Sequence, residues 1–163
     1  MGVLSQGELE DQLQVDAREL FRQLLQEHLE LRTVSEPRIA GVTDAARVPR
    51  PTAESGYSRG LTTVFGEVDV QRIAYRKRGP PNLHPADAVL TLPTEKNSHG
   101  LRQLAAIESS RGSFHGAVEA IGRATGQHLG KRQVEQLAGL AAVDFDTFYR
   151  QRQAPSVRSL TCW

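Results

Sequence analysis

The sequence predicts a mainly α-helical protein with a small β-hairpin, an α+β fold. Two observations support this prediction. Apolar residues recur at three- and four-residue steps toward both ends of the chain, which is the period of an amphipathic helix. Between these regions, the stretch around Gly66 partly alternates polar and apolar residues and is rich in β-branched side chains, as half-buried strands are.

The first expected element is a long helix over residues 6–33. Its apolar residues form a wide stripe: Leu9, Leu13, Ala17, Leu20, Phe21, Leu24, Leu25, Leu29 and Leu31. The spacing approaches a heptad repeat, but Glu27 interrupts the seam and the repeat is short for a coiled coil. A plain docking face is therefore favoured over a coiled-coil dimer.

Residues 34–60 contain Pro37, Pro49, Pro51 and three glycines without lasting periodicity, which predicts a linker with little fixed structure. Residues 62–76 then alternate on both sides of Gly66, so we expect two strands with a turn or bulge at this glycine. A proline-bounded loop follows, with a short extended piece at residues 89–92.

The last third of the chain is helical in pattern. The segment "HGLRQLAAIESSRG" predicts a short helix that ends at Gly112. Ser113 is a good N-cap for a second helix, and Gly126 can supply the positive φ that ends it. A third helix is expected from Lys131, and the pattern continues or is renewed in "VDFDTFYRQRQ". Residues 154–163 show no pattern.

Composition and charge bear on the cellular location of the protein and on its partners. The chain has 163 residues and a net charge of +1, but residues 1–33 carry seven acids and three bases, whereas residues 71–84 carry four bases and no acid. The single cysteine, Cys162, allows no intrachain disulfide and no cysteine-based zinc site, which favours a cytoplasmic location. No apolar run approaches the ~18 residues of a membrane span, so we expect no membrane association.

The two helices around the "TGQHLG" connection have the pattern of a helix-turn-helix unit. Val134 and Leu137 are expected to point inward, which leaves one group of polar residues on the outer side of the second helix. This group is Lys131, Arg132, Gln133 and Gln136. In such units the first turn of the second helix meets base edges, where Arg and Gln form paired hydrogen bonds. Many ordinary helical hairpins share this pattern.

A second candidate group lies in the basic stretch that ends in "YRKRG". Its members are Arg72, Arg76, Lys77 and Arg78. Such a run is commonly a solvated strand end. Beside a DNA-reading unit, however, the same residues are suited to contact phosphates.

No enzyme is visible in the sequence. The five histidines have no ligand spacing for a metal, and no phosphate loop, dinucleotide fingerprint or nucleophile elbow is present. His84 and Asp87 in "HPAD" suggest a catalytic pair, although a proline-locked turn with a capping aspartate is the commoner meaning. We therefore expect no catalytic residues, no metal, no cofactor and no small-molecule substrate.

Several long segments resemble a known family. In order and spacing, the N-terminal part of ISKra-type insertion-sequence transposases is similar to "TVFGEVDVQRIAYRKRG", "NLHPADAVLTLP", "SHGLRQLAAIESSRGSF" and "GKRQVEQLAGLAAVDFDTFY". The upstream "ARELFRQLLQEHLELR" resembles the helix that precedes this part. The resemblance implies a region that binds the terminal DNA of a mobile element, and it strengthens the DNA-binding interpretation of the helix pair.

The residue patterns and the resemblance together divide the chain. They give an N-terminal helix at residues 1–33, a linker at 34–60, a transposase-like DNA-binding region at 61–153 and an unpatterned tail at 154–163. In such transposases a catalytic RNase H-like domain follows, and its strand-helix context is missing from this sequence. The resemblance therefore implies a truncated or frameshifted copy that does not catalyse transposition by itself.

Three interpretations stay open at this point. The favoured one is a transposase-related protein that binds DNA. The second is a helical module in which residues 6–33 mediate self-association or pairing with a full-length transposase. The third is a non-functional pseudogene product without a stable fold.

Overall fold

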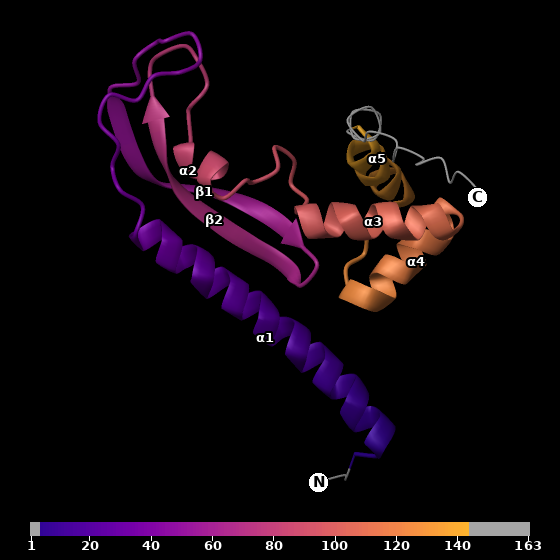
Figure 1. The fold of residues 1–163 in the computed structure, drawn as a ribbon. Coiled ribbons are helices and arrows are strands. Elements are labelled where there is room, and N and C mark those ends of the chain that lie inside the picture. The colour runs from indigo at the N-terminus through magenta and orange to yellow at the C-terminus, as the bar shows by residue number, and fades with distance from the viewer. Residues whose placement is uncertain (1–3, 144–163) are drawn as a thin grey trace, which may run out of the picture.

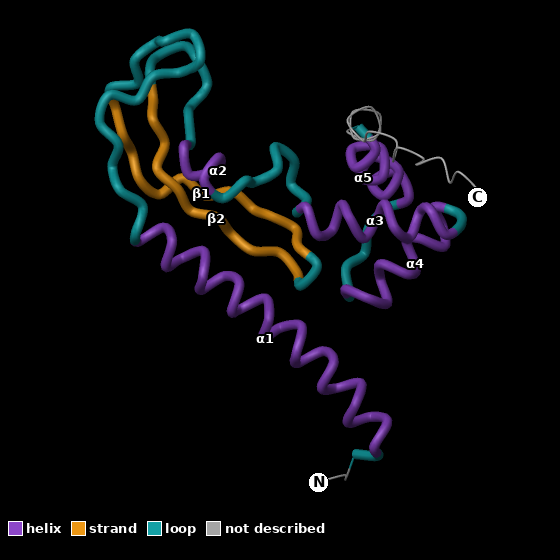
Figure 2. The backbone as a smooth tube through the Cα atoms, viewed as in Figure 1, coloured by secondary structure: helices purple, strands orange, loops and turns teal. Residues whose placement is uncertain are grey.

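The computed structural model describes residues 4–143, which form five helices and one two-stranded antiparallel sheet (Figures 1 and 2). The predicted mainly α, α+β class with one hairpin is confirmed. The tail at 154–163 and the continuation of the helical pattern from residue 144 onward lie outside the described residues. The elements are α1 (Gln6–Val34), β1 (Thr52–Thr63), β2 (Gly66–Arg76), α2 (Pro85–Val89), α3 (His99–Arg111), α4 (Phe114–Thr125) and α5 (Lys131–Ala142).

The long helix α1 confirms the prediction for residues 6–33. It begins with a capping box, in which the Glu8 backbone amide donates to Ser5 Oγ at 3.4 Å and the Ser5 amide donates to Glu8 Oε2 at 2.8 Å. Both exchanges satisfy amides that lack a partner at a helix start. In Figure 1 the C-terminal half of α1 runs beside the hairpin, and the N-terminal half extends beyond it.

The hairpin is longer than the sequence predicts. A turn over Val64 and Phe65 joins β1 to β2, as expected near Gly66, and a register shift lies between Glu54 and Tyr57. The prediction of an unstructured linker over 34–60 is wrong for residues 52–60, which belong to β1. This part of β1 has little apolar alternation, and it is a strand because its backbone pairs with β2.

The other edge of β2 forms hydrogen bonds with two side chains of α1 and with Glu36, two residues after the end of the helix. Gln26 donates to the Asp69 carbonyl at 3.2 Å and accepts from the Asp69 amide at 2.8 Å. Thr33 Oγ1 donates to the Gln71 carbonyl at 2.8 Å, and the Ile73 amide donates to Glu36 Oε2 at 2.9 Å. In Figure 1, β2 accordingly lies between β1 and α1.

A first core joins α1 to the hairpin. It consists of Leu29, Leu61, Val68 and Val70, with Leu25, Leu90 and Leu92 packed against them. The prediction of an extended piece over residues 89–92 is wrong, because Val89 is the last residue of α2 and a turn follows at Leu90 and Thr91. Helix α2 has Pro85 in its first turn. A proline at this position fits a helix start.

A second core holds the last three helices together. Helix α3 contacts both α4 and α5, which lie on different sides of it in Figure 1. The buried residues are Leu101, Ala105, Ala117, Ile121, Leu129, Val134 and Leu137. Two backbone hydrogen bonds attach this unit to β1, from the Thr62 amide to the Lys96 carbonyl at 2.8 Å and from the Ser98 amide to the Thr62 carbonyl at 2.9 Å.

Candidate nucleic-acid interface

The connection between α4 and α5 is held in a fixed shape. Ser113 Oγ accepts from the Gly116 amide at 3.1 Å, and Gly126 ends α4 in the left-handed region with φ 70°. Both predicted roles are confirmed. Leu129 is 3% exposed and inserts into the helical core, so the five-residue connection over 126–130 cannot swing freely. The start of α5 is therefore rigidly placed.

Burial fixes which side of α5 faces outward. Val134 and Leu137 are 0% and 2% exposed, which confirms that they point into the core. Lys131, Arg132 and Gln136 are exposed, and Gln133 is half-buried at the side of the helix. The structure thus brings the first predicted group together on the outer side and first turns of one helix.

The start of α5 is electropositive. Its N-cap, Gly130, has no side chain to accept from the free backbone amides, and the first turn contains no acid. Lys131 and Arg132 therefore add their charges to the positive end of the helix dipole. Lys131 Nζ lies 3.9 Å from Glu135 Oε1, and because both side chains are exposed this pair is weak. Phosphate groups bind well at such helix ends.

Helix α1 also contacts the end of α4. Arg18 Nη2 donates to the Arg123 carbonyl at 3.2 Å. A Cβ at Gly126 would lie 3.1 Å from Arg18 Nη1, so this arginine closes over the helix end. Arg123 itself points outward, is 73% exposed and lies 4.0 Å from Glu119. Arg123 is not among the residues predicted from the sequence, although a base in the last turn of the first helix of the pair is a visible signal.

The structure separates the members of the second predicted group. Arg72 is not available for phosphate contact, because its side chain is 11% exposed and its guanidinium is paired with Asp87. Arg76 is paired with exposed Glu54 and lies 6.0 Å above the Tyr57 ring. Lys77 and Arg78 follow β2 as exposed residues. Among residues 4–143, Lys77 and Arg78 have no ion-pair partner, so they are the two available cations of this group.

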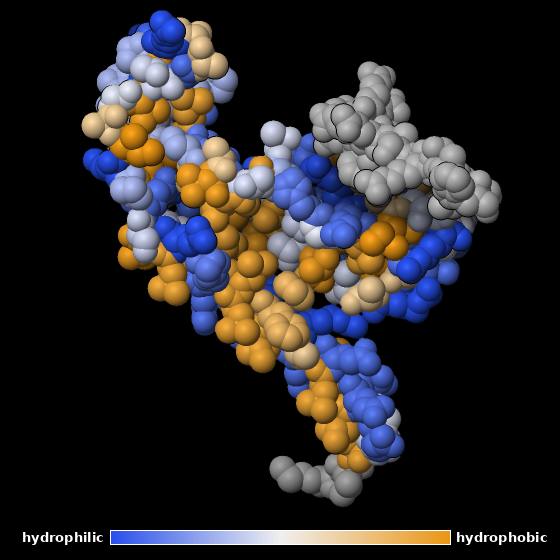
Figure 3. Space-filling view, in the orientation of Figure 1, coloured by the Kyte–Doolittle hydropathy of each residue, from blue (hydrophilic) through white to orange (hydrophobic). Residues whose placement is uncertain are grey.

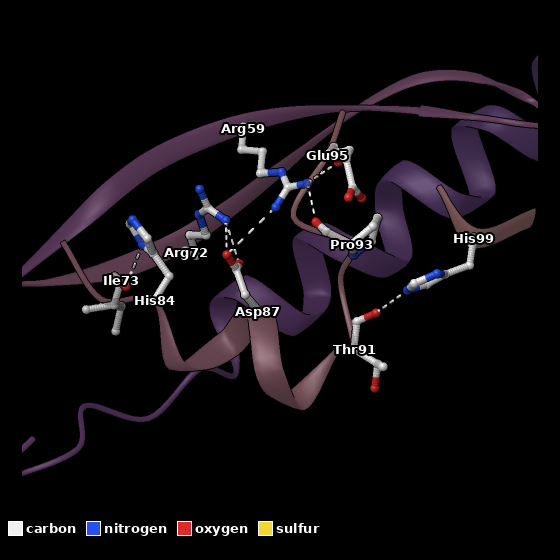
Figure 4. Close-up of polar contacts among 9 residues, drawn as sticks. All are labelled: Arg59, Arg72, Ile73, His84, Asp87, Thr91, Pro93, Glu95 and His99. Atoms are coloured by element: carbon white, nitrogen blue, oxygen red, sulfur yellow. Dashed lines mark hydrogen bonds and ion pairs between the residues drawn. The ribbon is translucent and has the colours of Figure 1, made fainter. Parts of the chain in front are cut away.

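Arg72 belongs to a half-buried cluster that sequence analysis did not foresee (Figure 4). Asp87 lies between Arg72 and Arg59, whose Nη1 is 3.9 Å from Asp87 Oδ2. Arg59 also donates to the carbonyls of Pro93 and Glu95. The cluster fastens the segment around α2 to both strands, and two arginines sharing one carboxylate leave it with a positive charge.

His84 does not pair with Asp87, so the structure gives no support to a catalytic pair in "HPAD". Its Nδ1 donates to the Ile73 carbonyl at 3.3 Å, while the Asp87 carboxylate faces the arginines (Figure 4). Burial lowers the pKa of His84, and the nearby positive charge of Arg72 lowers it further. The imidazole is accordingly uncharged at neutral pH.

The two basic groups lie at different ends of the hairpin. The turn end of the hairpin contacts α3 through Val64 and Gly100, whose ideal Cβ would be 3.6 Å from Val64 Cγ1. Lys77 and Arg78 follow the opposite end, where they line a shallow pocket of about 470 Å³. The intervening strand β2 spans roughly 33 Å. The basic residues of α5 and of the 76–78 loop therefore do not form one continuous patch.

Residues 4–143 contain no group of three His, Cys, Asp or Glu side chains placed to hold a metal ion. The two acids on the exposed face of β2 have other partners: Glu67 Oε1 is 2.5 Å from Lys96 Nζ, and Asp69 Oδ1 accepts from Ser58 Oγ at 3.4 Å. Within the same part of the chain, none of the helices has the length and apolar character needed to cross a bilayer.

In comparisons with known proteins, neither a protein family nor a curated protein matches this chain.

Proposed function

We propose that the protein binds double-stranded DNA through the unit formed by α3, α4 and α5, with α5 as the recognition helix. The observation that carries the proposal is the start of α5. It combines free backbone amides, no acid in the first turn and the exposed side chains of Lys131 and Arg132. Because Val134 and Leu137 are buried in the core, the side of α5 that carries Lys131 and Arg132 faces solvent.

Each side chain has a physical role in this proposal. Lys131 and the backbone amides at the start of α5 bind phosphate and set the position of the helix on the duplex. Arg132 and Gln136 are exposed and long enough to reach base edges in the major groove, where Arg pairs with guanine and Gln with adenine. Gln133 is half-buried, so it contributes at the margin of the contact.

Lys77 and Arg78 supply a second, independent phosphate contact in this proposal. They lie at the far end of the hairpin, about 33 Å from its turn. Arg72 is left out of the proposed interface because its charge is already paired with Asp87.

The resemblance to insertion-sequence transposases favours the terminal DNA of a mobile element as the target. We further infer that the chain alone neither cuts nor joins DNA, because strand transfer needs carboxylates that hold two metals about 4 Å apart. Incubation of the protein and labelled terminal-repeat DNA with Mg²⁺ or Mn²⁺ should leave the DNA intact. Nicking that disappears in Glu67→Ala/Asp69→Ala would contradict this inference.

The DNA-binding proposal is tested with Lys131→Ala/Arg132→Ala. Fluorescence anisotropy on a duplex carrying the terminal repeat should show weaker binding over a range of salt concentrations. Each phosphate contact that is lost should reduce the slope of log K against log salt by about 0.9. The matched control is Arg32→Ala/Arg38→Ala, which removes the same charge from exposed residues at and after the end of α1.

If the α5 variant binds as tightly as the unchanged protein and with the same salt slope, the DNA is not bound by α5. Weakening by both variants to the same degree would indicate attraction by net charge alone. A circular dichroism melt of each variant verifies that the fold is retained. No large change is expected, since all four side chains are exposed.

A further inference from the structure

Helix α1 has two apolar faces, and among residues 4–143 only one of them has a partner. Leu25 and Leu29 pack against the hairpin, and Phe21 lies 5.5 Å from the Phe65 ring. The remaining large apolar residues of the predicted stripe are about half exposed or more. They are Leu9, Leu13, Leu20, Leu24 and Leu31 at 47%, 56%, 54%, 52% and 68%, followed by Val34 at 86%.

The exposed residues have the order of a helix-docking seam. Positions 13, 17, 20, 24, 27, 31 and 34 follow one another at alternating four- and three-residue steps, which is the heptad pattern of helices packed side by side. We call these seven positions the outer seam. It is about 32 Å long at 1.5 Å per residue. Figure 3 shows hydrophobic side chains along the projecting part of α1, bordered by hydrophilic ones.

The charges around the outer seam are all negative. Glu27 lies in the seam, and Glu10, Asp16 and Glu30 lie beside it or in line with it. All four are exposed, and none forms an ion pair with another described residue.

Two of the three arginines of α1, Arg18 and Arg22, lie on the opposite side of the helix, and Arg32 donates from Nε to His28 Nε2 at 3.2 Å. Arg18 bonds to the Arg123 carbonyl, and Arg22 is next to Gly66, where its Cδ is 2.9 Å from an ideal Cβ. Arg32 lines a pocket with Leu29, which is packed on the hairpin. Among the described residues, none of these arginines forms an ion pair with Glu10, Asp16, Glu27 or Glu30.

We propose that the outer seam binds an amphipathic helix of another protein, whose apolar stripe is bordered by Lys and Arg. Leucines of the partner would pack between Leu13, Leu20, Leu24 and Leu31. Its flanking bases would pair with the four unpaired acids. A second copy of α1 fits less well, because two seams brought together would place eight acids and no base at the interface, and like charges oppose such pairing.

The test uses the purified full chain and two designed 21-residue helical peptides. Both have leucine at heptad positions a and d, and the flanking positions carry lysine in one peptide and glutamate in the other. Fluorescence anisotropy should show binding of the lysine peptide and none of the glutamate peptide. Glu27→Lys/Glu30→Lys should reduce or reverse this preference, because it changes the sign of two seam charges.

Leu20→Ser/Leu24→Ser should weaken binding of the lysine peptide at least about tenfold, since two buried leucine contacts are lost. The matched control is Val15→Ser, since Val15 is 57% exposed and lies outside the seam. It should bind within about twofold of the unchanged protein. Circular dichroism would establish that each variant keeps α1 helical.

Three results would overturn the proposal. In the first, the lysine peptide does not bind. In the second, it binds Leu20→Ser/Leu24→Ser as tightly as it binds the unchanged protein, which would indicate attraction by charge without the seam. Alternatively, sedimentation equilibrium of the chain alone could show a dimer that Leu20→Ser/Leu24→Ser dissociates. The occupant would then be a second copy of this chain. DNA binding by α5 is measured separately, so either proposal can fail without the other.

Discussion

Asp87→Asn tests whether the half-buried arginine cluster holds the hairpin and α2 together. The substitution keeps the size of the side chain and removes its charge. Arg72 and Arg59, whose side chains are 11% and 16% exposed, then lack their shared counter-charge. Removing one member of a buried ion pair costs about 3–5 kcal/mol. Because Asp87 is 28% exposed, water screens part of the effect, and we expect a loss near the lower limit, about 3 kcal/mol.

The measurement is urea unfolding followed by far-ultraviolet circular dichroism. The midpoint should fall while the slope with urea stays the same, because the surface exposed on unfolding does not change. The matched control is Glu54→Gln, which removes the partner of Arg76 from the same hairpin. Both side chains of that pair are about half exposed, at 49% and 47%, so this variant should unfold almost as the unchanged protein does.

A double variant identifies the group that is left without a partner. Arg72→Met/Asp87→Asn removes the buried cation together with its anion, and it should be more stable than Asp87→Asn alone. If Asp87→Asn costs no more than Glu54→Gln, the cluster does not fasten the two segments. If the double variant recovers nothing, Arg72 is not the group that suffers from the missing carboxylate.

Two further predictions concern the hairpin and its surroundings. Gly66→Ala should destabilise the fold by about 1–3 kcal/mol, because Gly66 has a φ of 137° that L-residues adopt only with strain. The control is Gly139→Ala on an open side of α5, which should leave the stability unchanged or raise it. The lowered pKa of His84 makes the folded state bind fewer protons than the unfolded state between the folded-state pKa and about 6.5. Stability should therefore fall as the pH decreases below 6.5, and chemical unfolding at pH 7 and pH 5 should show a smaller difference in His84→Gln.

The sequence predicts helices well where local signals and packing agree. The end of α4 at Gly126 and the inward direction of Val134 and Leu137 are correct, because a left-handed cap and an apolar stripe are both local features. The start of β1 at Thr52 was missed. Its residues carry no strong alternation, and only pairing with β2, which is distant in sequence, makes this segment a strand.

In the candidate interface, too, local features could be predicted from the sequence and long-range contacts could not. The outward direction of Lys131 and Arg132 follows from the period of one helix, so it could be predicted. The pairing of Arg72 with Asp87 could not, because it depends on how the segment around α2 folds back over the strands. A run of basic residues in a sequence therefore shows how many charges are present, but not which of them are already neutralised in the fold.

The bonds from Gln26, Thr33 and Glu36 to β2 have a consequence for handling this protein. They engage backbone groups at Asp69, Gln71 and Ile73, every second residue along the outer edge of the strand. An uncovered edge of this kind is a template onto which a strand from another molecule can add, and such additions lead to aggregates. Helix α1 thus shields the hairpin from misassembly. A fragment that begins after residue 36 would present this edge to solvent, so work on the α3–α5 unit should keep α1 or omit the hairpin together with it.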